Sequence, residues 1–147
     1  MPFFTLQVSP TGLIADAFIG VSAGKAAVLQ QAQQPVPAMQ RVRALIDTGA
    51  SGSCIDPMVL TALGLQPTGQ IAVHTPTTGA TPATCNQYDV GIMIPAPNGL
   101  PFQVPTTAVT EHEFFTAQGF HALIGRDILS RCVLIYNGQL GLFTLAY

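Results

Sequence analysis

Short stretches of β-forming residues, divided at close intervals by turn residues, run along most of the chain. Its 14 glycines and 12 prolines separate these stretches, which is typical of all-β proteins. Near the beginning, the pattern predicts strands over Phe3–Val8 and Leu13–Val21, joined into a hairpin by the turn residues Ser9–Gly12. The polar, proline-bounded stretch Gln30–Pro37 predicts a loop or a poor edge strand.

The middle of the chain predicts one strand followed by one short helix. Arg41–Ile46 is apolar enough for a strand that ends at Asp47. Asp56 suits a helix N-cap, the proline after it suits the first helical position, and Gly64 suits the end, so we expect a helix over Pro57–Leu63.

The second half of the chain predicts three hairpins and one more short helix. A long hairpin with a loose tip should run out over Ile71–Val73 and return over Tyr88–Ile94. Two Asn-Gly pairs predict further hairpins. These would join 92–94 to 102–104 and 132–136 to 140–147, and the second helix would span Arg126–Arg131. With no repeat or internal boundary, residues 1–147 predict one domain.

Composition narrows the possible locations and partners. Only 8 % of residues are charged, 48 % are hydrophobic and the mean hydropathy is +0.43. Charged and glycine residues nevertheless interrupt the apolar stretch Leu13–Leu29, which argues against a membrane span. The first basic residue is Lys25, so no signal peptide is expected and a cytoplasmic location is favoured. A net charge of −2 argues against nucleic acid as a partner and fits a sparsely charged dimer.

Two segments carry most of the information about chemistry. Residues 44–51 read Ala-Leu-Ile-Asp-Thr-Gly-Ala-Ser, and residues 122–129 read Ala-Leu-Ile-Gly-Arg-Asp-Ile-Leu. The first places the carboxylate of Asp47 at the end of an apolar strand, where the chain turns on a glycine. The pair resembles the retropepsin family of aspartic proteases, which implies a closed, β-rich half-domain with two short helices. Family members need two such aspartates, and this chain has one triplet, so the resemblance implies a homodimer.

The resemblance also assigns roles to the triplet. Asp47 would be the catalytic carboxylate. Thr48 would form a hydrogen bond across the two-fold axis, and Gly49 would allow the tight turn. Two such carboxylates sharing one proton can hydrolyse a peptide bond: the ionised one takes a proton from water while the protonated one donates to the substrate carbonyl.

Further residues match the family by position. Leu123 and the glycine two residues later would lie behind the triplet and line the inner subsites. Arg126 corresponds to an arginine that pairs with an aspartate just after the triplet; Ser51 holds that place here, so the pair would be absent or formed with Asp56. The flap tip would fall at residues 77–80. The candidate substrate-binding residues are therefore Ala50, Ser51, Thr78, Gly79, Ala80 and Leu123.

Other chemistries are disfavoured. The zincin motif needs a second histidine four residues after His112, and that position is Thr116, so no metal is expected. His121 is either a surface histidine or a residue facing the substrate groove. Three cysteines without metal spacing predict reduced thiols, and no cofactor is expected.

Two readings of function remain. The first is an aspartic endopeptidase that binds an extended peptide as a strand. The alternative is a catalytically inactive protein of the same fold, acting as a peptide-binding or oligomerisation module. For the dimer, the uncharged terminal segment Leu140–Tyr147 is expected to interleave with its counterpart in one sheet.

Overall fold

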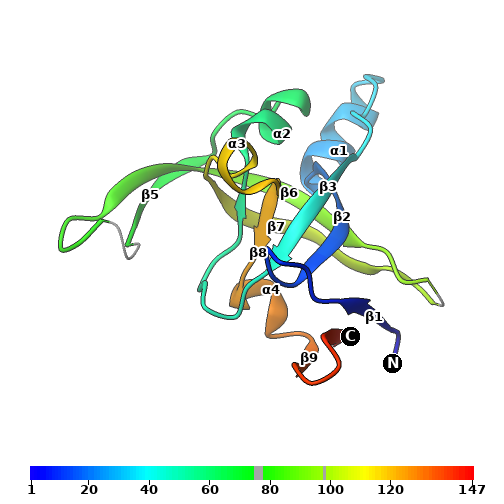
Figure 1. Cartoon of the computed structure of the whole chain (residues 1–147). Helices are drawn as coiled ribbons and strands as arrows, with labels where there is room; N and C mark the ends of the chain where they lie inside the picture. Colours follow the sequence, from blue (N-terminus) through cyan, green and yellow to red (C-terminus); the bar gives the residue numbers. More distant parts are fainter. Residues whose placement is uncertain (75–77, 98) are drawn as a thin grey trace.

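The computed structural model describes residues 1–74, 78–97 and 99–147, and its regular structure is mostly strand (Figure 1). The strands are β1 (Phe3–Gln7), β2 (Ile14–Val21), β3 (Gln40–Ile46), β4 (Cys54–Ile55), β5 (Gly69–Val73), β6 (Ala83–Ile94), β7 (Phe102–Glu111), β8 (Ala122–Ile124), β9 (Val133–Asn137) and β10 (Leu142–Ala146). The helices are α1 (Ala23–Gln31), α2 (Pro57–Ala62), α3 (Phe115–Gln118) and α4 (Arg126–Leu129).

The larger sheet closes into a barrel. Its strands follow the order β2-β3-β8-β4-β7-β6-β5. An additional pairing between β2, at one end of this order, and β6, near the other end, closes the sheet. Strands β3 and β8 run parallel, with Ala44 opposite Ala122 and Ile46 opposite Ile124. Because parallel strands end at the same edge, the residues that follow them, Asp47 and Gly125, are brought to one place.

The core fills this barrel with branched aliphatic side chains. Alternate residues of a strand point to the same face, and in β3 the inward residues Val42, Ala44 and Ile46 are all buried. Ile124 of β8 is fully buried beside them. Each large side chain removed from water contributes roughly 1.5–3 kcal/mol before the entropy of ordering is subtracted, so the strand that carries Asp47 has a rigid base.

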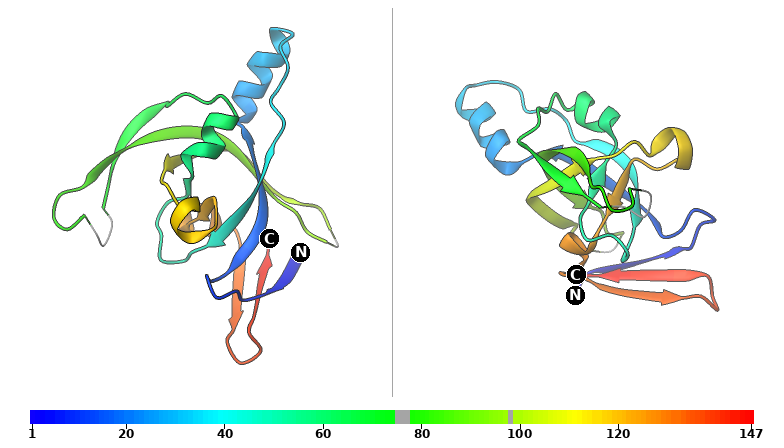
Figure 2. Two further views of the ribbon diagram at one scale, coloured as in Figure 1. Left: turned by 45° about the horizontal axis from the view of Figure 1, so that its top comes forward. Right: turned by 90° about the vertical axis from the view of Figure 1, so that its left-hand side faces the viewer.

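The two chain ends form a separate three-stranded sheet in the order β1-β10-β9 (Figure 2). The predicted hairpin of the first two strands is therefore wrong. The turn forms, with Ser9 and Gly12 exchanging backbone hydrogen bonds of 3.0 Å. The strands on either side then diverge, because β2 pairs with β3 and β6 while β1 pairs with β10.

The position of β10 also contradicts the expected interleaving of the terminal strand. Within the chain, β10 pairs on one edge with β1 and on the other with β9. Both of its backbone edges are occupied, so a strand from a second copy could add only to β1 or β9.

The helices are confirmed in two places and were missed in two. Helices α2 and α4 lie where the sequence predicts them. Helix α1 has no buried residue and thus no apolar stripe to reveal it, although Ser22 caps it by accepting a hydrogen bond from the amide of Lys25. Its last turn includes Gln30 and Gln31, for which the sequence predicts a loop or a poor edge strand. Within the described ranges, no helix is long and apolar enough to cross a membrane.

The hairpins of the second half are largely as predicted. Strand β5 pairs with residues 83–87, so the returning strand β6 begins earlier than expected. The pairing of Ile94 with Phe102 is confirmed, although Asn98 of the predicted turn lies outside the described residues. The final hairpin is confirmed, but Asn137 belongs to β9 and pairs with Leu142, so the turn spans residues 138–141.

Asp56 fastens two helices to the barrel. Its carboxylate accepts hydrogen bonds from the backbone amides of Met58 at 3.0 Å and of Phe114 and Phe115 at 2.9 Å. Burial alone would raise the pKa of this carboxyl group, but these donors outweigh burial and hold the pKa below its usual value. Asp56 therefore caps α2, as predicted, and also holds the segment that begins α3.

We expect Asp56→Ala to lower the free energy of unfolding by roughly 2–4 kcal/mol at neutral pH, because three donors lose a charged acceptor. Asp16→Ala is the matched control: Asp16 pairs only with Arg41 at the surface, and its loss should cost under about 1 kcal/mol. Since the folded pKa of Asp56 is depressed, its contribution is present above the unfolded pKa and is lost as the pH falls through the folded pKa. Urea unfolding of both variants between neutral and acidic pH measures this, and equal effects would contradict it.

Candidate active site

Asp47 is held in a tight turn at the end of β3. Its backbone amide donates to the carbonyl of Ile124 at 3.0 Å, and its Oδ1 accepts a hydrogen bond from the amide of Gly49 at 2.8 Å. The side chain is half-buried, and Thr48 and Gly49 are exposed. The carboxylate is thus oriented by its own turn, with one oxygen held.

Helix α4 holds the segment 47–53, here called the Asp47 loop. The amides at the start of α4 donate to the carbonyls of Ala50 at 3.0 Å and Ser51 at 3.2 Å. The Arg126 guanidinium donates through Nη1 to the carbonyls of Thr48 at 2.7 Å and Gly49 at 3.1 Å. Of the two alternatives for Arg126, pairing with Asp56 is wrong, because the arginine binds the backbone of the triplet instead.

Ser53 and Asp127 form a second link that sequence reasoning missed. The Ser53 hydroxyl donates to Oδ1 of Asp127 at 2.8 Å, and the Ser53 amide donates to Oδ2 at 3.0 Å. The same hydroxyl accepts from the amide of Gly125 at 3.0 Å. Asp127 follows the Gly-Arg pair of the second motif, which was the available signal, but its partner lies 74 residues away.

Gly125 is the closest packing point between the loop and α4. A Cβ placed on Gly125 would lie 2.6 Å from the carbonyl oxygen of Gly52, and real Cβ atoms essentially never approach backbone so closely. A glycine is therefore required for the loop and the helix to meet in this way.

The remaining candidate residues fall into two places. Leu123 lies in β8 opposite Leu45 and Cys54, close to Asp47 along the sheet, and is half-buried. Thr78, Gly79 and Ala80 lie beyond the end of β5, with Gly79 in the left-handed region at φ 59°. Thr77 lies outside the described residues. The triplet and Leu123 thus lie at the adjacent ends of the paired strands β3 and β8, and residues 78–80 lie in the loop beyond the last β5–β6 pair, Val73 with Ala83.

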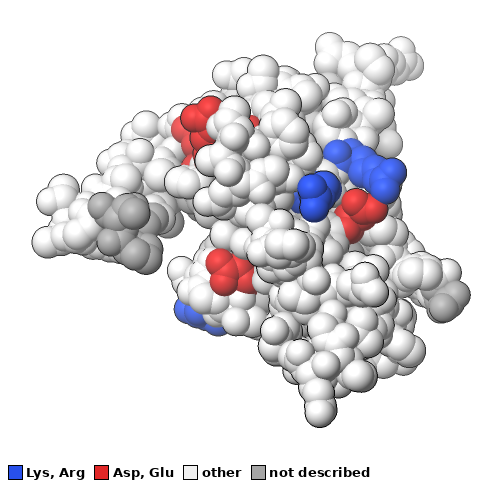
Figure 3. Space-filling model, in the orientation of Figure 1, with Lys and Arg blue, Asp and Glu red and all other residues white. Residues whose placement is uncertain are grey.

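Strand β5 and residues 83–87 of β6 form a projecting two-stranded hairpin, here called the arm. It extends on the side of the barrel where the Asp47 loop lies (Figures 1 and 2). The surface is hollowed below the arm (Figure 3). Residues 69–88 contain no Asp, Glu, Lys or Arg, so this hollow is bounded on one side by a hairpin that lacks these four residue types but includes His74.

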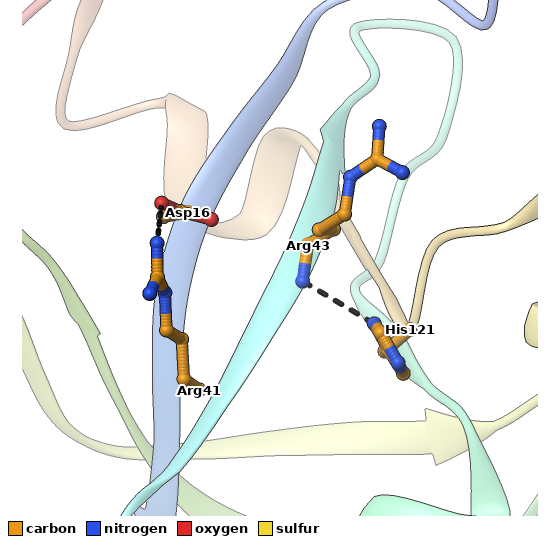
Figure 4. A network of polar contacts seen from close by, with 4 residues as sticks. All are labelled: Asp16, Arg41, Arg43 and His121. Atoms are coloured by element: carbon orange, nitrogen blue, oxygen red, sulfur yellow. Dashed lines mark hydrogen bonds and ion pairs between the residues drawn. The ribbon is translucent and has the colours of Figure 1, made fainter.

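Two other titratable side chains near these elements, those of His121 and Cys54, contact neighbouring residues of the fold. His121 accepts a hydrogen bond at Nδ1 from the amide of Arg43 and stacks on Phe115, at the opposite end of β8 from Gly125 (Figure 4). Cys54 lies 3.1 Å from the Thr110 hydroxyl, and burial raises the pKa of its thiol. Among the described residues, no three His, Cys, Asp or Glu side chains gather closely enough to hold a metal ion.

Comparison with known proteins gives one family match and one informative structure. A family model described as aspartyl protease matches residues 38–92, a segment that includes the Asp47 loop and β5. A retropepsin-like aspartic protease from Rickettsia conorii has a similar structure, with a TM-score of 0.59 and 14 % sequence identity over 99 % of this chain and 90 % of that one. No curated protein sequence matches the chain.

Proposed function

We propose that residues 1–147 of this retropepsin-like chain form one aspartic endopeptidase domain that works as a homodimer. The aspartyl protease match and the shared fold support a retropepsin-like protease. The observation that carries the proposal is the way Asp47 is positioned. Its carboxylate accepts a hydrogen bond within the glycine turn, and Arg126 of α4 donates to the backbone of the same turn.

The chemistry would require two Asp47 carboxylates, one from each subunit. The ionised carboxylate would take a proton from a water molecule as that water attacks the scissile carbonyl, and the protonated one would donate to the carbonyl oxygen. Because two close carboxylates cannot both ionise readily, the pair holds the shared proton that this step needs. Thr48 and Gly49 would support the pair across the two-fold axis.

The substrate would be an extended peptide lying between the Asp47 loop and the arm. Exposed strand edges on the arm would offer main-chain hydrogen bonds, which bind a peptide as an added strand. Ala50, Ser51 and Leu123 would contact it from below, and residues 78–80 from the tip of the arm. Since residues 69–88 contain no Asp, Glu, Lys or Arg, apolar or neutral side chains would be preferred around the cut bond.

Dimerisation would use the sheet formed by the chain ends. The strands β1, β9 and β10 contain no charged residue. Their outer face carries Phe3, Val133 and Ile135, which are 59 %, 50 % and 57 % exposed. An uncharged apolar face can pack against its own copy without like-charge repulsion, and β1 and β9 remain available as edges.

We expect Ile135→Lys to weaken the dimer at least about tenfold and to remove activity at low protein concentration, because it places a charge twice in a two-fold interface. Val28→Lys is the matched control, since Val28 is 60 % exposed on α1, away from the terminal sheet. Sedimentation equilibrium and an activity titration against protein concentration measure both effects. An Ile135→Lys protein as dimeric as the control would show that the subunits meet elsewhere.

The rival function is that of a non-catalytic module with the same fold, which fold similarity alone does not exclude. Incubation with a peptide library separates the two: the wild-type protein should cleave and Asp47→Asn should not. Peptide binding without cleavage by the wild-type dimer would favour the rival.

A further inference from the structure

The arm leaves the barrel at a point where backbone pairing to the body stops. Strand β6 pairs with β7 as far as Gln87, opposite Thr110, and residues 83–86 pair only with β5. Beyond Gln87, the backbone hydrogen bonds of the arm are thus made within the arm. Because β6 runs without a break from the barrel into the arm, its backbone gives the arm its direction, and side chains at this junction supply the further contacts between the two.

Glu111, the last residue of β7, provides those contacts. Its Oε1 accepts a hydrogen bond from Asn86 Nδ2 at 2.7 Å, and its Oε2 accepts one from the Tyr88 hydroxyl at 2.9 Å. Asn86 in turn accepts at Oδ1 from Gln70 Nε2 at 3.2 Å. A continuous series of side-chain hydrogen bonds therefore connects β5 through β6 to the barrel. It links the strands beyond the last backbone pair of β6 with β7.

The charge of Glu111 strengthens this junction. Hydrogen bonds to an ionised acceptor are about twice as strong as neutral ones, and both oxygens of Glu111 are used. Tyr88 is buried, and burial together with its bond to Glu111 raises the pKa of its hydroxyl, which keeps it a donor. In Figure 3 acidic side chains lie at the base of the arm, and the arm itself carries no charge.

We propose that Glu111 is a positioning residue: by binding Asn86 and Tyr88 it fixes the angle of the arm above the Asp47 loop and so sets the affinity for the peptide. This inference rests on the proposed protease function. Glu111 does not touch the reacting atoms. Its effect should appear in the binding of substrate, which the arm would cover, more than in the chemical step.

Steady-state kinetics test the inference with Glu111→Gln and Tyr88→Phe, which keep the shape of each side chain. We expect each variant to raise KM about 5- to 20-fold with kcat within about twofold, since an interaction common to ground and transition states is lost. The double variant should be little worse than Glu111→Gln alone, because Tyr88→Phe removes one of the two hydrogen bonds that Glu111→Gln weakens. Glu113→Gln is the matched control: it removes the same charge two residues away, from an exposed side chain, and should leave KM unchanged.

Amide hydrogen exchange tests the junction without requiring proteolysis. In Glu111→Gln, residues 69–73 and 83–87 should exchange at least about tenfold faster while β2 and β3 stay as protected as in wild type. Faster exchange in the arm together with raised KM supports the inference. Unchanged exchange overturns it, and so does faster exchange with unchanged KM. If the wild-type protein is inactive but amide exchange in the arm is still faster in Glu111→Gln, both the proposed function and the positioning role are overturned. Only a structural contact between Glu111 and the arm is then supported.

Discussion

Replacing Asp47 with asparagine should lower kcat/KM by at least about 10³-fold, because the substitution removes the group that takes and gives the proton. The amide has the same shape, and its oxygen can still accept the hydrogen bond from the amide of Gly49 that orients the side chain. The fold and the dimer should therefore survive. Hydrolysis of a fluorogenic peptide, with circular dichroism and sedimentation as controls of structure, measures the effect.

Asp16→Asn is the matched control for this substitution. Asp16 pairs at the surface with Arg41 and lies in β2, so its loss should leave activity within twofold, about the scatter of surface substitutions. Residual activity of Asp47→Asn within tenfold of wild type, with contaminating protease excluded, would remove Asp47 from the mechanism.

The second large effect is expected for Gly125→Ala, a change of one methyl group that leaves every polar group in place. The added Cβ would lie 2.6 Å from the carbonyl oxygen of Gly52, so the Asp47 loop or α4 must shift. Because displacement of a reacting group by about 1 Å can cost 10²-fold in rate, we expect activity to fall by roughly that factor or more. The melting temperature should also drop.

Gly52→Ala provides the control in the same loop. A Cβ on Gly52 meets no atom within 4 Å, and its backbone is not in the left-handed region. Its activity and melting temperature should stay close to those of wild type. If Gly125→Ala were as active as Gly52→Ala, close packing of α4 on the loop would not be what positions Asp47.

Local signals predicted the parts of this molecule that local interactions determine. The cap formed by Asp56, the helix after it and the turn of Asp47 each depend on residues within a few positions, and the structure contains all three. The final hairpin lies where its Asn-Gly pair predicts one, although its turn spans residues 138–141. Helix α1 was missed because it buries no side chain, so its sequence has no periodic apolar face.

The failures concern partners that are distant in the sequence. Strand β1 looked like the partner of β2, yet the pattern of a strand does not say which edge it will pair with, and β10 is its partner. For Arg126 the sequence left open an absent ion pair or one with Asp56, and the side chain binds backbone carbonyls of the triplet, which have no signature in sequence. The Ser53–Asp127 link joins residues 74 positions apart, and only the fold brings them together.

The central claim, that two copies of Asp47 act together, is tested most directly by mixing subunits. Wild-type protein and Asp47→Asn are combined at fixed total concentration, well above the dimer dissociation constant, and left to exchange subunits. If each active site needs one Asp47 from each subunit, activity should follow the square of the wild-type fraction, so an equal mixture should retain about one quarter. Activity of about one half, in direct proportion to the wild-type fraction, would contradict a shared site.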